Sequence, residues 1–319
     1  LEAPQRSNLY NPQLPPLGLL KFSAWHKVQG DKVYFAQGYD SVEGFQPDQI
    51  YITSLFTYAF VPVHGVINFY HKKFPRVPVK IGGIYASLCY EHLLKIFPFI
   101  EVFVGIENRV ENILPDYSLV PEWHEKEKKS LLFSSRGCLR HCRFCAVPKI
   151  EPVYSAKKSI KHLIHPEHTK IEFMDNNFTA SPYWKDILKE LQELGKEVDF
   201  NQGLDARLFT KEMAEGFRGI NIPIIRFAYD IKSLKTEEAL KRTVDYVTNI
   251  MQLRGREIIV YTLFNFIDTP EDFFHRVKFL LQLGVVCFPM KYQPLEPIPK
   301  NSYISPKWTN TELKMVKDM

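Results

Sequence analysis

The sequence has few cysteines and no long hydrophobic run. Only 5 of its 319 residues are cysteine, a usage typical of a reducing compartment, so we expect no disulfide framework and a cytoplasmic location. No apolar run reaches the roughly eighteen residues that a membrane helix needs, so we expect no membrane partner. A Walker loop and a serine-hydrolase elbow are also missing, which argues against the enzyme classes that carry those motifs.

Strong charge of one sign is also lacking. The chain has 41 lysines and arginines against 36 aspartates and glutamates, a net charge of +5. A dedicated nucleic-acid-binding protein usually clusters its positive charge more strongly. The composition therefore permits a nucleic-acid partner without indicating one.

Three of the five cysteines lie close together. Cys138, Cys142 and Cys145 form a C-x₃-C-x₂-C triplet directly after the apolar stretch 131–135. Three thiolates at this spacing can ligate three irons of a 4Fe–4S cluster and leave the fourth iron without a protein ligand. A structural zinc site needs four ligands, usually as two pairs. We favour the open cluster, and zinc stays open as the alternative.

With Phe144 directly before its third cysteine, the triplet resembles the signature of the radical S-adenosylmethionine superfamily. The resemblance implies a 4Fe–4S cluster whose open iron binds S-adenosylmethionine. One electron then cleaves this cofactor to methionine and a 5′-deoxyadenosyl radical, which abstracts a hydrogen atom from the substrate. It also implies an enzyme of oxidoreductase or methyltransferase type, with an external electron donor of the flavodoxin or ferredoxin type. Phe144 would shield the cluster and line the adenine site.

Residues 1–112 alternate between short apolar runs and helical stretches. The expected strands are 32–36, 49–56, 77–83 and 101–105, and the expected helices are 17–29, 58–74 and 85–96. This alternation predicts a Rossmann-like, doubly wound sheet. Residues 113–130 carry many charges and no sustained period, which predicts a linker.

The amino-terminal half resembles the cobalamin-binding domain that precedes many radical S-adenosylmethionine enzymes. The shared elements are Pro15-Pro16-Leu17-Gly18-Leu19, Thr53-Ser54-Leu55 and Gly82-Gly83. In that family the second element lies along the nucleotide tail of cobalamin, and the glycines let the backbone approach it closely. The D-x-H-x-x-G loop that ligates cobalt is missing, and Thr53 replaces the family's serine. Cobalamin-assisted methyl transfer or rearrangement, and a domain that keeps the fold without the cofactor, both stay open.

Residues 131–319 again alternate between strands and helices. The expected strands are 131–135, 170–174, 197–202, 223–229, 257–263 and 284–290. Helix starts are expected at Ser181-Pro182, Thr210, Thr236 and Thr269-Pro270. Six βα units are fewer than the eight of a closed barrel. They are similar to the partial, six-unit TIM-like barrel of the superfamily.

Polar residues follow several of these strands, where a βα barrel builds its site. From the resemblance we expect cofactor contacts, beside Phe144, from Asp175, Asn176, Asn177, Asn201, Arg226 and Asp230. An arginine at the depth of Arg226 suits the methionine carboxylate through paired hydrogen bonds. Asp205 and Arg207 are equally consistent with a cofactor contact and with a structural ion pair. Asp268 is expected to belong to the start of a helix.

The alternative to an enzyme is a non-catalytic iron–sulfur or zinc protein that binds nucleic acid. The lack of a fourth cysteine within reach of the triplet, and of a basic stripe with interleaved aromatics, argues against it. No loop indicates the substrate.

Overall fold

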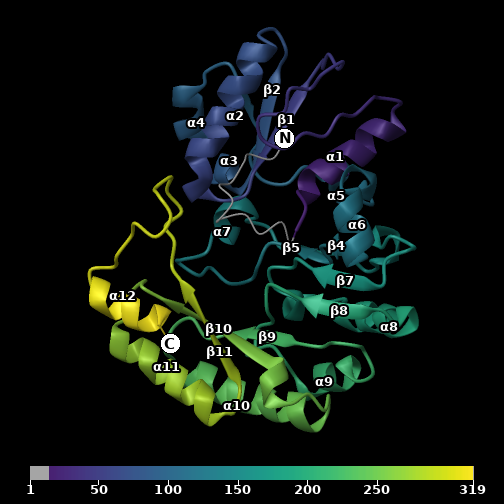
Figure 1. Ribbon diagram of the computed structural model, residues 1–319. Coiled ribbons are helices and arrows are strands. Elements are labelled where there is room, and N and C mark those ends of the chain that lie inside the picture. The colour runs from purple at the N-terminus through teal and green to yellow at the C-terminus, as the bar shows by residue number, and fades with distance from the viewer. Residues whose placement is uncertain (1–13, 319) are drawn as a thin grey trace. The chain divides into compact units, whose positions relative to one another are not determined.

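Parallel strands with helices between them make up most of the chain, so the fold is of the α/β class (Figure 1). The computed structural model describes residues 14–318. Within that range it contains twelve α-helices and three three-stranded parallel sheets. The chain divides into two compact units. Unit 1 runs to Glu127 and adds 149–151 and 294–302, and unit 2 takes the other residues from Lys128 onward.

Unit 1 is built on the sheet β1-β2-β3, formed by β1 (Ile50–Ser54), β2 (Val79–Gly83) and β3 (Glu101–Val102). Its other main elements are α1 (Leu17–Val28), η1 (Thr57–Ala59), α2 (Phe60–Lys73), α3 (Ile84–Leu88) and α4 (Tyr90–Ile96). Ile50 and Ile52 of β1 share a buried cluster with Val66 of α2. Strand side chains alternate between two faces, so this spacing buries one face of β1 under a helix.

Two expectations for unit 1 are wrong. The run 32–36 is not a strand. The side chains of residues 32–35 are exposed or half-buried, Ala36 alone is buried, and the run forms no ladder with β1, β2 or β3. Valine and aromatic residues favour a strand only where they pack on neighbouring strands. The single helix expected over 85–96 is broken at Cys89, whose φ of −125° separates α3 from α4.

The hydroxyl of Tyr85 is hydrogen-bonded to two histidines in unit 1. It lies 2.8 Å from Nε2 of His64 and 2.9 Å from Nδ1 of His92. Burial, and then the nearby His92, lower the pKa of His64 to about 4. This imidazole is therefore neutral at neutral pH.

The segment 113–130, expected to be an irregular linker, is partly helical. After α5 (Asn108–Glu111), it contains η2 (Tyr117–Leu119) and α6 (Pro121–Glu127). The side chain of Asp116 caps η2 by accepting from the Ser118 N–H at 3.3 Å, and it pairs with Lys27 of α1 at 2.7 Å. The sequence pattern predicted a linker because the ion pair with Lys27 joins residues far apart along the chain and has no local signal.

Six parallel strands of unit 2 form two sheets in chain order. One sheet is β4 (Lys129–Leu132), β7 (Lys170–Phe173) and β8 (Glu197–Phe200), and the other is β9 (Ile225–Ala228), β10 (Ile258–Phe264) and β11 (Val286–Lys291). Isolated bridges from Glu197 to Asn221 and from Leu204 to Phe227 join the segments beside β8 and β9. All six strands expected in this half are confirmed to within a few residues.

The helices between these strands begin at hydroxyl caps in two of the four expected places. Thr210 accepts from the Met213 N–H, and Thr269 forms a reciprocal capping box with Asp272. The expectation for Thr236 is wrong, because α10 begins one turn earlier, after Ser233. Ser181 accepts from the Tyr183 N–H in a turn that precedes α8. The helices are α8 (Trp184–Leu194), α9 (Lys211–Phe217), α10 (Leu234–Asn249), α11 (Pro270–Gln282) and α12 (Asn310–Lys317).

The short elements of the chain connect these strands and helices. They are β5 (Ser135–Arg136), α7 (Val147–Ile150), β6 (Ser155–Ala156), η3 (Lys161–Leu163), η4 (Phe178–Ala180) and η5 (Gly255–Glu257). No helix within residues 14–318 is both long and apolar enough to cross a membrane.

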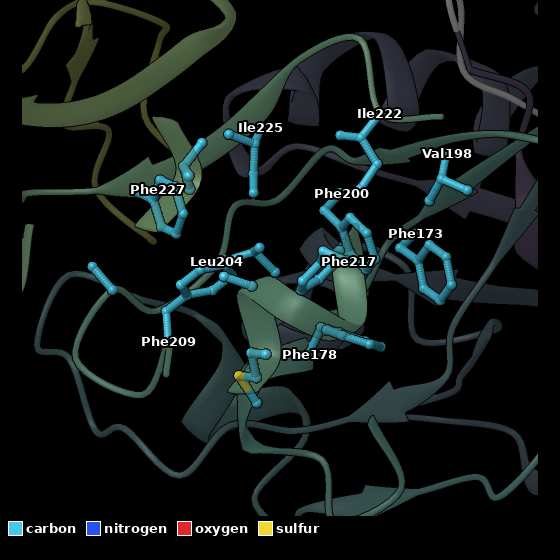
Figure 2. Packing of buried hydrophobic residues seen from close by; sticks show 14 of the residues in the cluster. Phe173, Phe178, Val198, Phe200, Leu204, Phe209, Phe217, Ile222, Ile225 and Phe227 are labelled. Atoms are coloured by element: carbon cyan, nitrogen blue, oxygen red, sulfur yellow. The ribbon is translucent and has the colours of Figure 1, made fainter. Parts of the chain in front are cut away.

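Phenylalanines pack together with aliphatic side chains in the core of unit 2 (Figure 2). The ring centroid of Phe200 lies 4.6 Å from that of Phe173, 4.7 Å from that of Phe178 and 5.4 Å from that of Phe217. Burying each such ring contributes about 1.5–3 kcal/mol. Because side chains alternate along a strand, this packing leaves the other face to the polar residues that precede or follow each phenylalanine.

Candidate functional site

The cysteine triplet lies on the loop that follows β4. After β4 the chain forms β5, which pairs antiparallel with β6, and then turns at Gly137. Gly137 has a φ of 73°, in the left-handed region that favours glycine. This turn leads directly into Cys138.

Backbone N–H groups donate to two of the three sulfur atoms. The Arg140 N–H donates to Sγ of Cys138 at 3.3 Å, and the Val147 N–H donates to Sγ of Cys145 at 3.4 Å. The Cys145 N–H donates to the carbonyl of Cys142 at 3.0 Å, which closes the loop. Hydrogen bonds to sulfur favour the thiolate, the form that binds a metal.

The pKa values of two of the thiols are raised above the ordinary value. Burial raises the pKa of Cys142, and the nearby Asp230 and Cys138 raise it further. Burial also raises the pKa of Cys145, where Cys142 and Cys138 add to the effect. Coordination to a metal deprotonates a thiol outright. A cationic centre would therefore relieve the repulsion that these closely placed sulfurs exert on one another.

The sulfur spacing bears on which metal centre fits. Among the described residues, the three sulfur atoms do not all lie within 4.8 Å of one another. Sulfurs bound to one zinc ion at about 2.3 Å would be only about 3.8 Å apart. The triplet therefore does not have the spacing of three sulfurs that already share one zinc ion.

Asp175, expected to contact the cofactor, has hydrogen-bond partners within the protein. Its carboxylate accepts from the Ser134 N–H at 2.8 Å, from the Ser134 hydroxyl at 2.6 Å and from the Ser135 hydroxyl at 2.6 Å. Burial raises the pKa of Asp175, and these hydrogen bonds oppose the shift. Asp175 thus fastens the end of β7 to the segment that leads into the cysteine loop.

Asn177 contacts a sulfur of the triplet. Its Nδ2 donates to Sγ of Cys138 at 3.5 Å, and its Oδ1 accepts from the Thr179 hydroxyl at 2.8 Å. Asn177 is 3% exposed, whereas Asn176, the preceding residue, is half-buried.

An ion-paired cluster beside the triplet contains a residue that sequence reasoning missed. Asp205 accepts from Nε of Arg207 at 2.7 Å and from Nε of Arg140 at 2.9 Å. Burial alone raises the pKa of Asp205, but the bonds from Arg207 and Arg140 outweigh it, so the pKa lies below its usual range. The Asp205–Arg207 pair was one of the two expected alternatives and is confirmed. Arg140, which lies between Cys138 and Cys142, contacts Asp205 across 65 residues of sequence. No pattern of neighbouring residues predicts a contact over that separation.

Asp230 lies near two of the cysteines. Its charge raises the pKa of both Cys142 and Cys145. Burial raises the pKa of Asp230 itself to about 6, against the opposing effect of Arg276. The carbonyl of Asp230 accepts from Nη1 of Arg276, which is fully buried.

Arg276 also joins the ends of two further segments. Its Nη2 donates to the Leu263 carbonyl at 2.9 Å and to Oδ2 of Asp268 at 2.5 Å. The expected helix start at Thr269 is confirmed, but Asp268 has this buried ion pair as well. Sequence reasoning missed Arg276 because it lies within the apolar stripe of α11.

Arg226 and Asn201 lie in a polar layer on the strand face opposite the phenylalanines. Arg226 pairs with Asp199 of the neighbouring β8. Nδ2 of Asn201 donates to Glu172 at 2.9 Å, and Lys129 donates to the other oxygen of Glu172 at 2.7 Å. The guanidinium of Arg226, expected to meet the methionine carboxylate, has a carboxylate partner within the protein.

Phe144 is half-buried beside the loop that follows β10. Its ring centroid lies 5.8 Å from that of Phe266, at an interplanar angle of 80°. The triplet loop, which includes Phe144, follows β4, and Asn177, Asp205 and Asp230 follow β7, β8 and β9. The site therefore draws on the loops after four strands, all within unit 2.

No protein-family model matches the chain, and no curated protein matches it. The functional argument therefore depends on the geometry of the site.

The elements of unit 1 that resemble a cobalamin site have internal roles. Gly83 has a φ of 97°, and a Cβ there would lie 2.4 Å from the carbonyl oxygen of Ser54. The Ser54 hydroxyl donates to the Gly82 carbonyl at 3.2 Å and accepts from the Ala86 N–H at 3.3 Å. The close contact between β1 and β2 thus accounts for the glycine and the serine, and we derive no step through cobalamin.

Proposed function

We propose that this chain is a radical S-adenosylmethionine enzyme, with a Rossmann-like unit 1 and a partial six-unit βα barrel in unit 2. The observation that carries the proposal is the cysteine triplet, on the loop after the first of six parallel strands, with N–H groups directed at its sulfurs. Three thiolates would leave one iron of a 4Fe–4S cluster available to a small molecule.

The order of the strands supports the barrel. β4, β7, β8, β9, β10 and β11 follow one another in both sequence and space, with bridges between the two sheets. The polar residues of the site follow these strands, where parallel βα folds bind their ligands. The same arrangement explains why Asp175 and Asp205 can both reach the cysteine loop.

The residues of the site have distinct proposed roles. Cys138, Cys142 and Cys145 would hold the cluster, which when bound supplies the electron that cleaves S-adenosylmethionine. Asp205 and Arg140 hold the loop through their ion pair. Asp230 and Asn176 offer a carboxylate and an amide to the ammonium group of the cofactor. Only two cysteines lie outside the triplet, too few for a second cluster, so an external donor of the flavodoxin or ferredoxin type would deliver the electron.

Anaerobic reconstitution tests the proposal. The chain is incubated with iron and sulfide, reduced with dithionite and mixed with S-adenosylmethionine, and 5′-deoxyadenosine is measured. We expect product from the wild type and from the control Cys287→Ala, whose thiol bonds to Thr262 away from the triplet. Cys142→Ala is expected to give none.

Two other outcomes would change the assignment. A chain that takes up zinc, forms no cluster and cleaves nothing would be a metal-binding protein without catalysis, and nucleic-acid binding would then be the function to test. A chain that forms the cluster and also retains added cobalamin after gel filtration, seen in its visible spectrum, would require a corrinoid step that our proposal does not contain.

A further inference from the structure

Three hydrogen bonds in series end on the sulfur of Cys138. The Asp205 N–H donates to the Thr179 hydroxyl oxygen at 3.2 Å, the Thr179 hydroxyl donates to Oδ1 of Asn177 at 2.8 Å, and Nδ2 of Asn177 donates to Sγ of Cys138 at 3.5 Å. Asn177 and Thr179 are only 3% and 5% exposed. Their bonds are therefore made within the protein interior.

The first bond of this series sets the direction of the others. A backbone N–H can only donate, so the Thr179 oxygen accepts from Asp205 and its own hydrogen is available to Asn177. The carbonyl end of the Asn177 amide is then fixed toward Thr179, and its NH₂ end toward the sulfur. Turning the amide over would place its oxygen against a sulfur that is anionic when it binds a metal. Bonds in such a chain also polarise one another.

We propose that Asn177 raises the reduction potential of the cluster through its bond to Cys138, and that Thr179 acts as a positioning residue that holds the amide in the donating orientation. This inference depends on the proposed function, because it presumes the cluster. An added electron increases the negative charge on the cluster sulfurs. A donor at a sulfur therefore stabilises the reduced state more than the oxidised state, and such bonds are among the factors that set these potentials.

The test measures the midpoint potential of the reconstituted cluster, with a mediated electrode supplying one electron and electron paramagnetic resonance reporting the reduced form. We expect Asn177→Leu and Thr179→Val each to lower the ratio of reduced to oxidised cluster at a fixed potential. Loss of a bond to a charged acceptor suggests a change of about tenfold, or about 59 mV for a one-electron couple. Thr179→Ser keeps the hydroxyl and is expected to retain the wild-type potential.

Thr262→Val is the matched control, because Thr262 is a fully buried threonine whose hydroxyl donates to the Val260 carbonyl away from the triplet. Its potential is expected to equal that of the wild type. If Asn177→Leu fails to form a cluster, Thr179→Val decides the question, because it leaves Asn177 in place.

The outcomes separate this inference from the proposed function. A wild-type chain that forms the cluster and cleaves S-adenosylmethionine, with an unchanged potential in Thr179→Val, would overturn the inference and leave the function standing. A wild-type chain that forms no cluster would overturn both.

Discussion

Replacing Arg276 by methionine removes the cation from the most buried ion pair described in unit 2. The side chains of Arg276 and Asp268 are 0% and 6% exposed, and their charged groups lie 2.5 Å apart. Arg276→Met leaves the Asp268 carboxylate buried without its partner and removes the donors to the carbonyls of Leu263 and Asp230. Breaking a buried pair by removing one member costs about 3–5 kcal/mol, so we expect the free energy of unfolding of unit 2 to fall by that amount.

A double-mutant cycle tests the cause of this loss. Asp268→Asn removes the charge but keeps an oxygen that can accept from the Phe266 N–H, a bond of 3.1 Å in the wild type. We therefore expect Asp268→Asn added to Arg276→Met to recover about 1–3 kcal/mol, the desolvation penalty of an unpaired buried group.

The assay is denaturant unfolding followed by circular dichroism and by tryptophan fluorescence. Trp308 is 4% exposed, and its Nε1 donates to the Asp268 carbonyl at 3.0 Å, so it reports on this part of unit 2. A loss below about 1 kcal/mol in Arg276→Met, or a double variant no more stable than the single one, would refute the reasoning.

Three further predictions concern other contacts. Asp205→Asn is expected to lower the iron content per chain after reconstitution, because it removes the carboxylate that holds the cysteine loop; Glu215→Gln, at an exposed pair, should bind iron as the wild type does. The pKa of His64 is lowered to about 4 from its ordinary 6.5, so the unfolded chain takes up its proton first and unit 1 should lose stability as pH falls from about 6.5 to 4. This loss should be smaller in His64→Gln, and an equal pH dependence of the denaturant midpoint would contradict it. Gly83→Ala should destabilise unit 1 by more than about 2 kcal/mol, whereas Gly30→Ala, also at positive φ but with nothing within 4 Å of the added Cβ, should cost only about 1 kcal/mol.

Local patterns predicted the elements of unit 2 better than its contacts. The six strands and the caps at Thr210 and Thr269 follow from apolar runs and hydroxyl positions, which are signals within a few residues. The partners of Arg140 and Arg226 were not predictable in this way, because they lie 65 and 27 residues away in sequence. In unit 1, the run 32–36 had strand-forming residues, but pairing with a neighbouring strand is not encoded locally.

The sequence predicted which residues belong to the candidate site better than it predicted how they are bonded to one another. The triplet, Asn177 and Asp230 do come together in unit 2. Asp175 was also chosen for its position after a strand, but its bonds to Ser134 and Ser135 depend on how β4 and β7 align. The cluster, the cofactor and the reaction stay predictions, since they depend on chemistry that awaits the reconstitution experiment.

Asp205 performs two tasks with two different parts of the same residue. Its carboxylate anchors the cysteine loop through Arg140, and its backbone N–H begins the series of bonds that ends at Cys138. Replacing the loop after β8 in an engineered or diverged relative would consequently affect the cysteine loop as well. Any insertion there that displaced Asp205 would disturb both the placement of the cysteine loop and the hydrogen bonding at the Cys138 sulfur, so the two properties should vary together.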